Sequence, residues 1–105
     1  MKPNILHRKS DAPRQSIPLL FVHGAFAGAW CWDEHFLPYF QALGYDCCAL
    51  NFRAHGFRAH GADANWCYLQ LLGIQDYAQD IAWALEQCPR PPVLIGHSMG
   101  AFAVL

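Results

Sequence analysis

A serine near the end of the sequence has neighbours that could make its hydroxyl a nucleophile. Ser98 is the centre of a Gly-x-Ser-x-Gly pattern in which Gly96 and Gly100 are the two glycines. The apolar residues 92–95 precede this pattern, and the apolar residues 99–105 follow it. A strand that turns sharply into a helix would hold Ser98 strained and exposed, with other backbone too close to both glycines for a side chain. The sequence therefore predicts that Ser98 is a catalytic nucleophile at this turn, a nucleophile elbow.

A second loop could donate hydrogen bonds to the negative charge that such a reaction develops. The apolar run 19–22 ends at His23 and Gly24, and small residues follow. The backbone N–H of Ala25 in this loop and that of Met99 at the start of the expected helix could form an oxyanion hole. The alternative is a tight turn whose glycines only avoid clashes. We expect His23 to form structural hydrogen bonds within the loop rather than to act as a base.

Three further histidines lie near these motifs, and none has the position expected of a general base. His97 precedes the nucleophile, but side chains alternate along a strand, so it should point away from Ser98. His55 and His60 occupy equivalent places in two consecutive copies of Phe-Arg-Ala-His-Gly. We interpret the first copy as a polar turn after a strand and the second as an insertion that lengthens a surface loop.

The rest of the sequence contains the strands and helices that would position these loops. Short apolar runs are typical of buried strands, and apolar residues three or four positions apart are typical of amphipathic helices. We expect strands near residues 17–22, 46–50 and 92–96, and helices near residues 32–43, 74–88 and 99–105. Because strands and helices alternate, the predicted architecture is a three-layer α/β fold with a short parallel sheet.

Length and composition limit the chain to one small domain. The sequence has 105 residues, of which 54% are hydrophobic and 14% charged, and this apolar content suggests a surface that packs on a neighbour. Residues 1–16 are polar and are expected to form an extended or poorly ordered lead-in to a domain at residues 17–105. The formal net charge of -1 gives no reason to expect binding to nucleic acid or to an anionic membrane.

Cysteine and histidine usage suggests neither disulfides nor metals. The five cysteines are an odd number without a Cys-x-x-Cys pair, and we interpret them as reduced thiols in a cytoplasmic protein. The adjacent Cys47 and Cys48 would point to opposite faces of a strand. The six histidines are dispersed, so we expect no metal and no cofactor. The apolar run 17–22 contains Pro18 and is too short for a signal peptide or a transmembrane segment.

Together these motifs resemble those of the α/β-hydrolase superfamily, over about residues 17–105. The elbow Gly-His-Ser-Met-Gly is intact. The segment Asp-x-Arg-Gly-His-Gly of that family is similar to residues 51–56, with departures at Asn51 and Ala54. The family pattern His-Gly-x-x-x-Gly-x-x-x-Trp is matched by His23, Gly24, Gly28 and Trp32.

The resemblance implies a serine esterase, similar to lysophospholipases, whose substrate is a small-molecule carboxylic ester, lipid ester or thioester. It implies that Ser98 is the nucleophile and that the N–H groups of Ala25 and Met99 form the oxyanion hole. A serine at the elbow argues against the dehalogenase branch, which uses an aspartate there. In this family the acid and the histidine of the triad follow the serine, so both are expected beyond residue 105. We therefore expect a truncated, N-terminal portion of a hydrolase, with little activity by itself.

Two alternatives remain open at this stage. The chain could be a catalytically inactive fragment that acts as an interaction module. The edge of its last strand would be open and apolar, which favours self-association. The same serine and oxyanion loop could also serve an acyltransferase or a lyase, because one fold supports several reactions.

Overall fold

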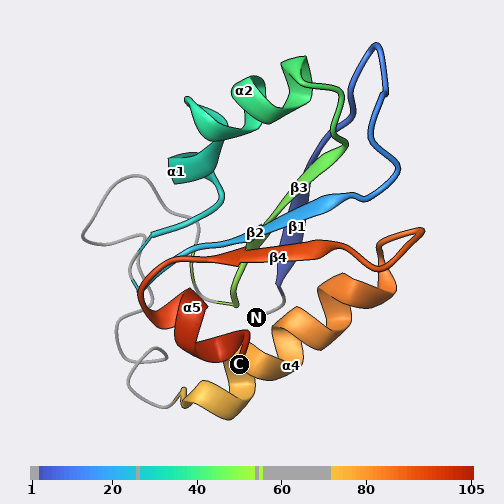
Figure 1. Cartoon of the computed structure of the whole chain (residues 1–105). Coiled ribbons are helices and arrows are strands. Elements are labelled where there is room, and N and C mark those ends of the chain that lie inside the picture. Colours follow the sequence, from blue (N-terminus) through green and yellow to red (C-terminus); the bar gives the residue numbers. More distant parts are fainter. Residues whose placement is uncertain (1–2, 26, 54, 56–71) are drawn as a thin grey trace.

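The computed structural model describes residues 3–25, 27–53, 55 and 72–105. Figure 1 shows a twisted sheet with α1 and α2 on one face and α4 and α5 on the other. The predicted three-layer α/β architecture is therefore confirmed for this part of the chain. Its elements are β1 (Asn4–Arg8), β2 (Leu19–Val22), α1 (Trp30–Asp33), α2 (Phe36–Ala42), β3 (Cys47–Asn51), α4 (Ile74–Glu86), β4 (Val93–Gly96) and α5 (Met99–Ala103).

The sheet is mixed, with the strand order β1-β3-β2-β4. β2 pairs in parallel with β3 and with β4, so the parallel strands expected from the sequence are confirmed. β1 pairs antiparallel with β3, and Ile5 lies opposite Leu50. This corrects the expectation that residues 1–16 are only a lead-in. β1 is an edge strand of five residues, in which Asn4 and His7 are exposed while Ile5 and Leu6 are half-buried against the two apolar clusters.

Two apolar clusters fill the space between the sheet and its helices. Leu20 and Leu50 belong to the cluster on the α4 side, and Phe21 belongs to the cluster on the side of α1 and α2. All four residues of β2 are buried, because this strand lies inside the sheet and is covered on both faces. Cys48 belongs to the first cluster and Cys47 to the second, which confirms that they point to opposite faces.

The helices follow the predicted ranges with one change. The helix expected at residues 32–43 is divided into α1 and α2, and Pro38 lies in the first turn of α2, where a missing N–H is tolerated. α4 lies within the expected residues 74–88, and the N–H of Gly73 donates to the Asp76 carboxylate at 2.8 Å to cap it. The repeated copy at residues 57–61 lies outside the described residues.

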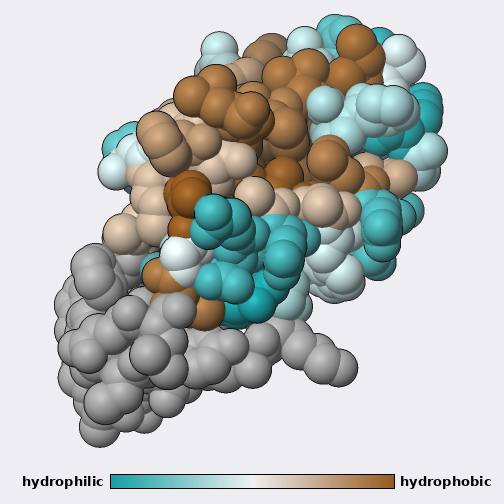
Figure 2. All heavy atoms as spheres, turned by 90° about the horizontal axis from the view of Figure 1, so that it is seen from below, coloured by the Kyte–Doolittle hydropathy of each residue, from teal (hydrophilic) through white to brown (hydrophobic). Residues whose placement is uncertain are grey.

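The surface also carries apolar side chains. Figure 2 shows one face of the molecule, on which apolar and polar areas lie next to each other. The exposed large apolar side chains include Leu85, Val93 and Phe102. Every helix within the described ranges is too short or too polar to cross a lipid bilayer.

Candidate active site

Ser98 lies at the bend where β4 passes into α5. β4 ends at Gly96, α5 begins at Met99, and Ser98 is exposed. The backbone of Ser98 has φ 56° and ψ -120°, and it is the one residue other than glycine with positive φ in the described chain. Such a conformation costs a residue with a Cβ roughly 1–3 kcal/mol. The sharp, strained bend predicted at Ser98 is confirmed, whereas its catalytic role stays a prediction.

The two glycines of the motif are required by close backbone contacts. A Cβ on Gly96 would lie 2.6 Å from the Cα of Ala101. A Cβ on Gly100 would lie 2.5 Å from the carbonyl oxygen of Val22 and would also collide with that of His23. Because real Cβ atoms essentially never come within 3.0 Å of such atoms, neither glycine can be replaced without a backbone shift. The predicted exclusion of side chains is confirmed, and it packs α5 directly on the end of β2.

The loop after β2 passes beside Ser98. A Cβ on Gly24 would lie 3.1 Å from the Cβ of Ser98 and 3.3 Å from the carbonyl oxygen of His97. The N–H of His97 donates to the carbonyl of Val22 at 3.1 Å, which extends the pairing of β2 with β4. The structure therefore brings together, at the carboxyl ends of two neighbouring strands, the loop and the serine that the sequence singled out.

Two backbone donors lie at this same edge of the sheet. Ala25 follows Gly24 and is exposed. Met99 is the first residue of α5, so its N–H has no acceptor within the helix. Neither N–H donates to a backbone carbonyl in the turns, loops and helix caps of the described residues, 3–25, 27–53, 55 and 72–105. Both groups remain predicted oxyanion-hole donors.

His23 is a structural residue, as the sequence predicted. Its side chain is fully buried, its Nδ1 lies 2.6 Å from the carbonyl oxygen of Gly24, and the N–H of Phe52 donates to its Nε2 at 3.1 Å. Because Nε2 accepts a hydrogen bond, the ring hydrogen must be on Nδ1, which donates to Gly24. Burial lowers the pKa of His23 to about 4. The imidazole is therefore neutral and is occupied on both nitrogens.

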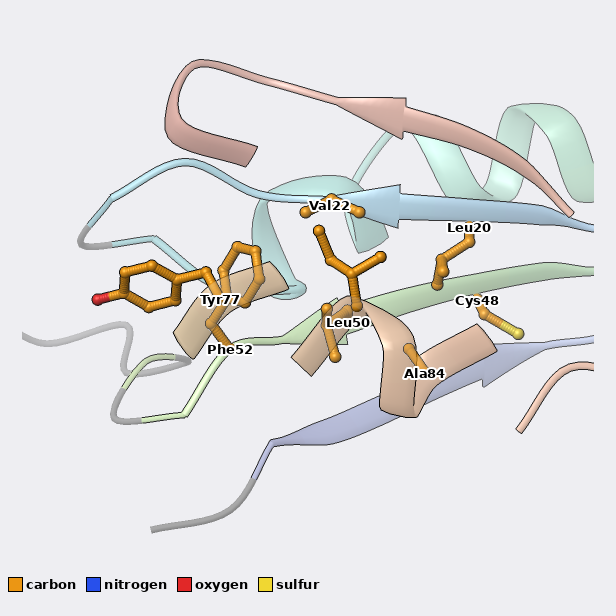
Figure 3. Packing of buried hydrophobic residues seen from close by; sticks show 8 residues of the cluster. Leu20, Val22, Cys48, Leu50, Phe52, Tyr77 and Ala84 are labelled. Atoms are coloured by element: carbon orange, nitrogen blue, oxygen red, sulfur yellow. The ribbon is translucent and has the colours of Figure 1, made fainter. Parts of the chain in front are cut away.

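Aromatic side chains surround this imidazole. Figure 3 shows Phe52 and Tyr77 beside one another at the end of the apolar cluster on the α4 side, and their ring centroids are 4.8 Å apart. The ring of His55 lies 5.2 Å from that of His23, and burial lowers the pKa of His55. These contacts enclose the loop after β2 from the side of β3 and α4.

A buried ion pair holds the segment that follows β3. Asp80 in α4 is only 1% exposed. One of its carboxylate oxygens accepts hydrogen bonds from Nε and Nη2 of Arg53 at 2.9 and 2.8 Å, and the other accepts from the backbone N–H of Arg53 at 2.9 Å. The sequence analysis did not single out Asp80. The available signal was its spacing from Tyr77 and Ala84, which places a carboxylate on the buried face of α4.

An apolar hollow borders the elbow. It has a volume of about 300 Å³ and is lined by Ala27, Cys31, Trp32, Phe36 and His97. Because most of its lining is apolar, this hollow suits the hydrocarbon part of a small molecule better than a charged group. Among the described residues, no three His, Cys, Asp or Glu side chains are grouped so that they could hold a metal ion.

Comparison with known proteins places this geometry in a family. The sequence model of the alpha/beta hydrolase family matches residues 19–105. Methylesterase 2 of Arabidopsis thaliana is 30% identical over 87 residues, which cover 81% of this chain and 31% of that protein. Norfluorocurarine synthase 1 of Strychnos nux-vomica is 28% identical over 86 residues, which cover 80% of this chain and 30% of that protein. The chain thus spans about a third of the length of these curated relatives.

Solved structures agree with the sequence relatives. The thioesterase domain from the curacin biosynthetic pathway has a TM-score of 0.71 at 25% identity, and the match covers 96% of this chain and 33% of that one. A putative non-heme bromoperoxidase from Mycobacterium tuberculosis H37Rv shares the fold, with a TM-score of 0.73 at 24% identity and coverage of 99% and 34%. Through its strand order, its elbow and these matches, the chain belongs to the alpha/beta hydrolase family.

Proposed function

We propose that this protein is a serine hydrolase that cleaves a carboxylic ester or a thioester through an acyl group on Ser98. The observation that carries this proposal is the strained backbone of Ser98, at φ 56°, on an exposed bend. Strain of this kind persists only where the surroundings enforce it, and such positions cluster at active sites. Here the close packing around Gly96 and Gly100 enforces it.

The reaction would proceed in two steps. The Oγ of Ser98 attacks the carbonyl carbon of the substrate, its proton passes to a base, and the alcohol or thiol leaves with a proton. Water then attacks the acyl group, and the free acid leaves while Ser98 regains its hydrogen. In the intermediates the negative oxygen would accept hydrogen bonds from the N–H groups of Ala25 and Met99.

The base and its acidic partner would come from outside the described site. Residues 99–105 contain no Asp, Glu or His, and in this family both partners follow the serine. We place them beyond residue 105. Without a base, the hydroxyl of Ser98 is a weak nucleophile, and only the effect of the oxyanion hole and of binding would remain.

The relatives support the substrate class. One is named a methylesterase and one solved structure is named a thioesterase domain, so both ester and thioester cleavage occur among the proteins that this chain resembles. The apolar hollow beside His97 could receive the hydrocarbon part of such a substrate, including that of a lipid ester.

The cysteines fit a protein of the cytoplasm, which we also propose as its location. The described cysteines, Cys31, Cys47, Cys48 and Cys88, are free. Burial raises the pKa of Cys47 to about 11 and that of Cys48 to about 12, so both thiols stay protonated and unreactive.

Labelling with a fluorophosphonate probe tests the proposal. The purified chain is treated with the probe in the presence and absence of added imidazole, which can act as a general base in solution. We expect slow labelling of Ser98, accelerated by imidazole and absent in Ser98→Ala. Ser16 is exposed and serves as the internal control, located by mass spectrometry. If Ser98 reacts no faster than Ser16 with imidazole present, the proposal is wrong.

One observation favours a second candidate, an interaction module. β4 is the last strand in the sheet order, and Val93 in this strand is 48% exposed. An apolar edge strand can pair with a strand of another chain. Light scattering after size-exclusion chromatography would show self-association in the wild-type chain and a monomer in Val93→Lys. A wild-type monomer at high concentration would exclude pairing between copies.

A further inference from the structure

The buried contacts of His23 have a geometrical consequence for the neighbouring peptide group. The imidazole Nδ1–H donates to the carbonyl oxygen of Gly24, the residue that follows it. That carbonyl and the N–H of Ala25 belong to one planar peptide group. Because the described chain has no cis peptide bond, the two groups point in opposite directions. Holding the oxygen against the imidazole therefore turns the N–H of Ala25 away from it.

The imidazole is itself held in place. Its Nε2 accepts the N–H of Phe52, and the next N–H, that of Arg53, donates to the buried carboxylate of Asp80. A series of hydrogen bonds thus leads from α4 through the segment after β3 to the carbonyl of Gly24. Two rings also pack against the imidazole, since the centroids of Phe52 and His55 lie 4.9 and 5.2 Å from that of His23.

The backbone of His23 is fixed from the other side. Gly100 of α5 packs directly on the carbonyl of His23, and Gly24 lies against Ser98. Residues 23 and 24 are therefore confined by α5, the helix that begins at Met99. The hydrogen bond from the imidazole to the carbonyl of Gly24 restricts rotation of the peptide group between Gly24 and Ala25.

We propose that His23 is a positioning residue, which aims the N–H of Ala25 at the oxyanion site beside Ser98 by holding the carbonyl of Gly24. This inference rests on the proposed function of Ser98. His23 neither touches the substrate nor moves a proton. Its contribution is that the donor is already oriented before charge develops, which is the condition under which such donors accelerate a reaction.

Two substitutions separate this role from a general contribution to stability. The amide nitrogen of asparagine is two bonds from Cβ, as Nδ1 is, so His23→Asn keeps the donor to Gly24 and loses the acceptor for Phe52. The carbonyl oxygen of glutamine is three bonds from Cβ, as Nε2 is, so His23→Gln keeps the acceptor for Phe52 and loses the donor to Gly24. Each variant loses one buried hydrogen bond, and each is the matched control of the other.

Two measurements are made on the wild-type chain and on both variants. The first is the rate at which a fluorophosphonate labels Ser98 with imidazole added. We expect His23→Gln to be slower than wild type by about tenfold to a hundredfold and His23→Asn to stay within about threefold. The second is the amide order parameter of Ala25, which should be near 0.85 in wild type and in His23→Asn and should fall below about 0.6 in His23→Gln.

The outcomes distinguish this inference from the function on which it rests. If Ser98 is not labelled but the order parameter of Ala25 still differs between the variants, the proposed function fails and the positioning role stands. If Ser98 is labelled equally fast in both variants, the positioning role is wrong and the function stands. An order parameter below about 0.6 for Ala25 in the wild-type chain would overturn the inference without any variant.

Discussion

Two neighbouring parallel strands end in a histidine at the same register, and the two histidines have opposite surroundings. Val22 of β2 pairs with Gly96 of β4, so His23 and His97 are the next residues of their strands. His23 is fully buried and bonded through both ring nitrogens. His97 is exposed and lines an open apolar hollow. The residue type and its place in the strand are alike, so the difference must come from the position of each strand in the sheet.

β2 is an inner strand and β4 is the last in the strand order. The end of β2 is enclosed by β3, by α4 and by the first turn of α5, and every polar atom of the His23 side chain has a partner there. The end of β4 is open, and it carries the strained backbone of Ser98. The enclosed end of β2 therefore leads into Ala25, one of the two proposed donors, whereas the open end of β4 presents the hydroxyl of Ser98 beside the other proposed donor, Met99. Both ends depend on the glycines by which α5 contacts them.

The largest effect is expected from Gly100→Ala, which would push α5 away from the end of β2. The new methyl group would meet the backbone carbonyls of Val22 and His23, and backbone atoms cannot move aside as side chains can. We expect the free energy of unfolding to fall by about 4 kcal/mol or more. Urea denaturation followed by tryptophan fluorescence measures it.

Gly73→Ala is the matched control for this substitution. Gly73 has φ -115°, and among the described residues a Cβ there would meet only the side-chain oxygen of Gln75 at 3.5 Å, an ordinary contact. The loss should be less than about 1 kcal/mol. Equal losses in the two variants would show that α5 does not rest on the end of β2.

A smaller effect is expected from pH, and the buried His23 contributes to it. The pKa of His23 is lowered by burial from 6.5 to about 4. At pH values between about 4 and 6.5, His23 binds a proton in the unfolded chain but not in the folded chain. The free energy of unfolding therefore falls as the pH is lowered through this range. The contribution is complete above about pH 6.5 and is lost as the pH falls toward 4, by up to about 3 kcal/mol.

The variant His23→Asn isolates this contribution. His55 also has a lowered pKa, so the wild-type profile contains more than one titration. Asparagine does not titrate, and the difference between the two unfolding profiles reports His23. Parallel profiles from pH 7.5 to 4.5 would mean that His23 is not held neutral.

The open strand end was the easier one to predict from the sequence. One short motif predicts the bend at Ser98 and the exclusion of side chains at Gly96 and Gly100, although the backbone that Gly100 contacts belongs to the distant Val22 and His23. β2 and β4 could be predicted because a short apolar run before a glycine is a local signal. The proposed roles of Ala25 and Met99 follow from their places beside these bends.

The support of the enclosed strand end depends on contacts between distant residues, and the sequence did not reveal it. Asp80 reaches Arg53 across 27 positions, and a carboxylate in an amphipathic helix is normally assigned to the solvent face. β1 pairs with β3 across 39 to 47 positions, and Asn4 lies opposite Asn51. Such pairings are decided by tertiary packing, because edge strands are short and half polar and lack a strong periodic signal.

The smallest expected effect concerns the strain at the open end, and it is a gain in stability. Glycine adopts positive φ without a steric cost, whereas alanine keeps the Cβ that strains Ser98. Both Ser98→Gly and Ser98→Ala remove the hydroxyl, so their difference reports the strain. Relief of the strain is partly offset by the greater freedom of glycine in the unfolded chain, and we expect Ser98→Gly to be about 1 kcal/mol more stable than Ser98→Ala. The two variants are compared by urea denaturation at pH 7.5. If Ser98→Ala proves the more stable of the two, the bend is relaxed, and the contrast between a satisfied strand end and a strained one no longer supports the proposal of a reactive hydroxyl at Ser98.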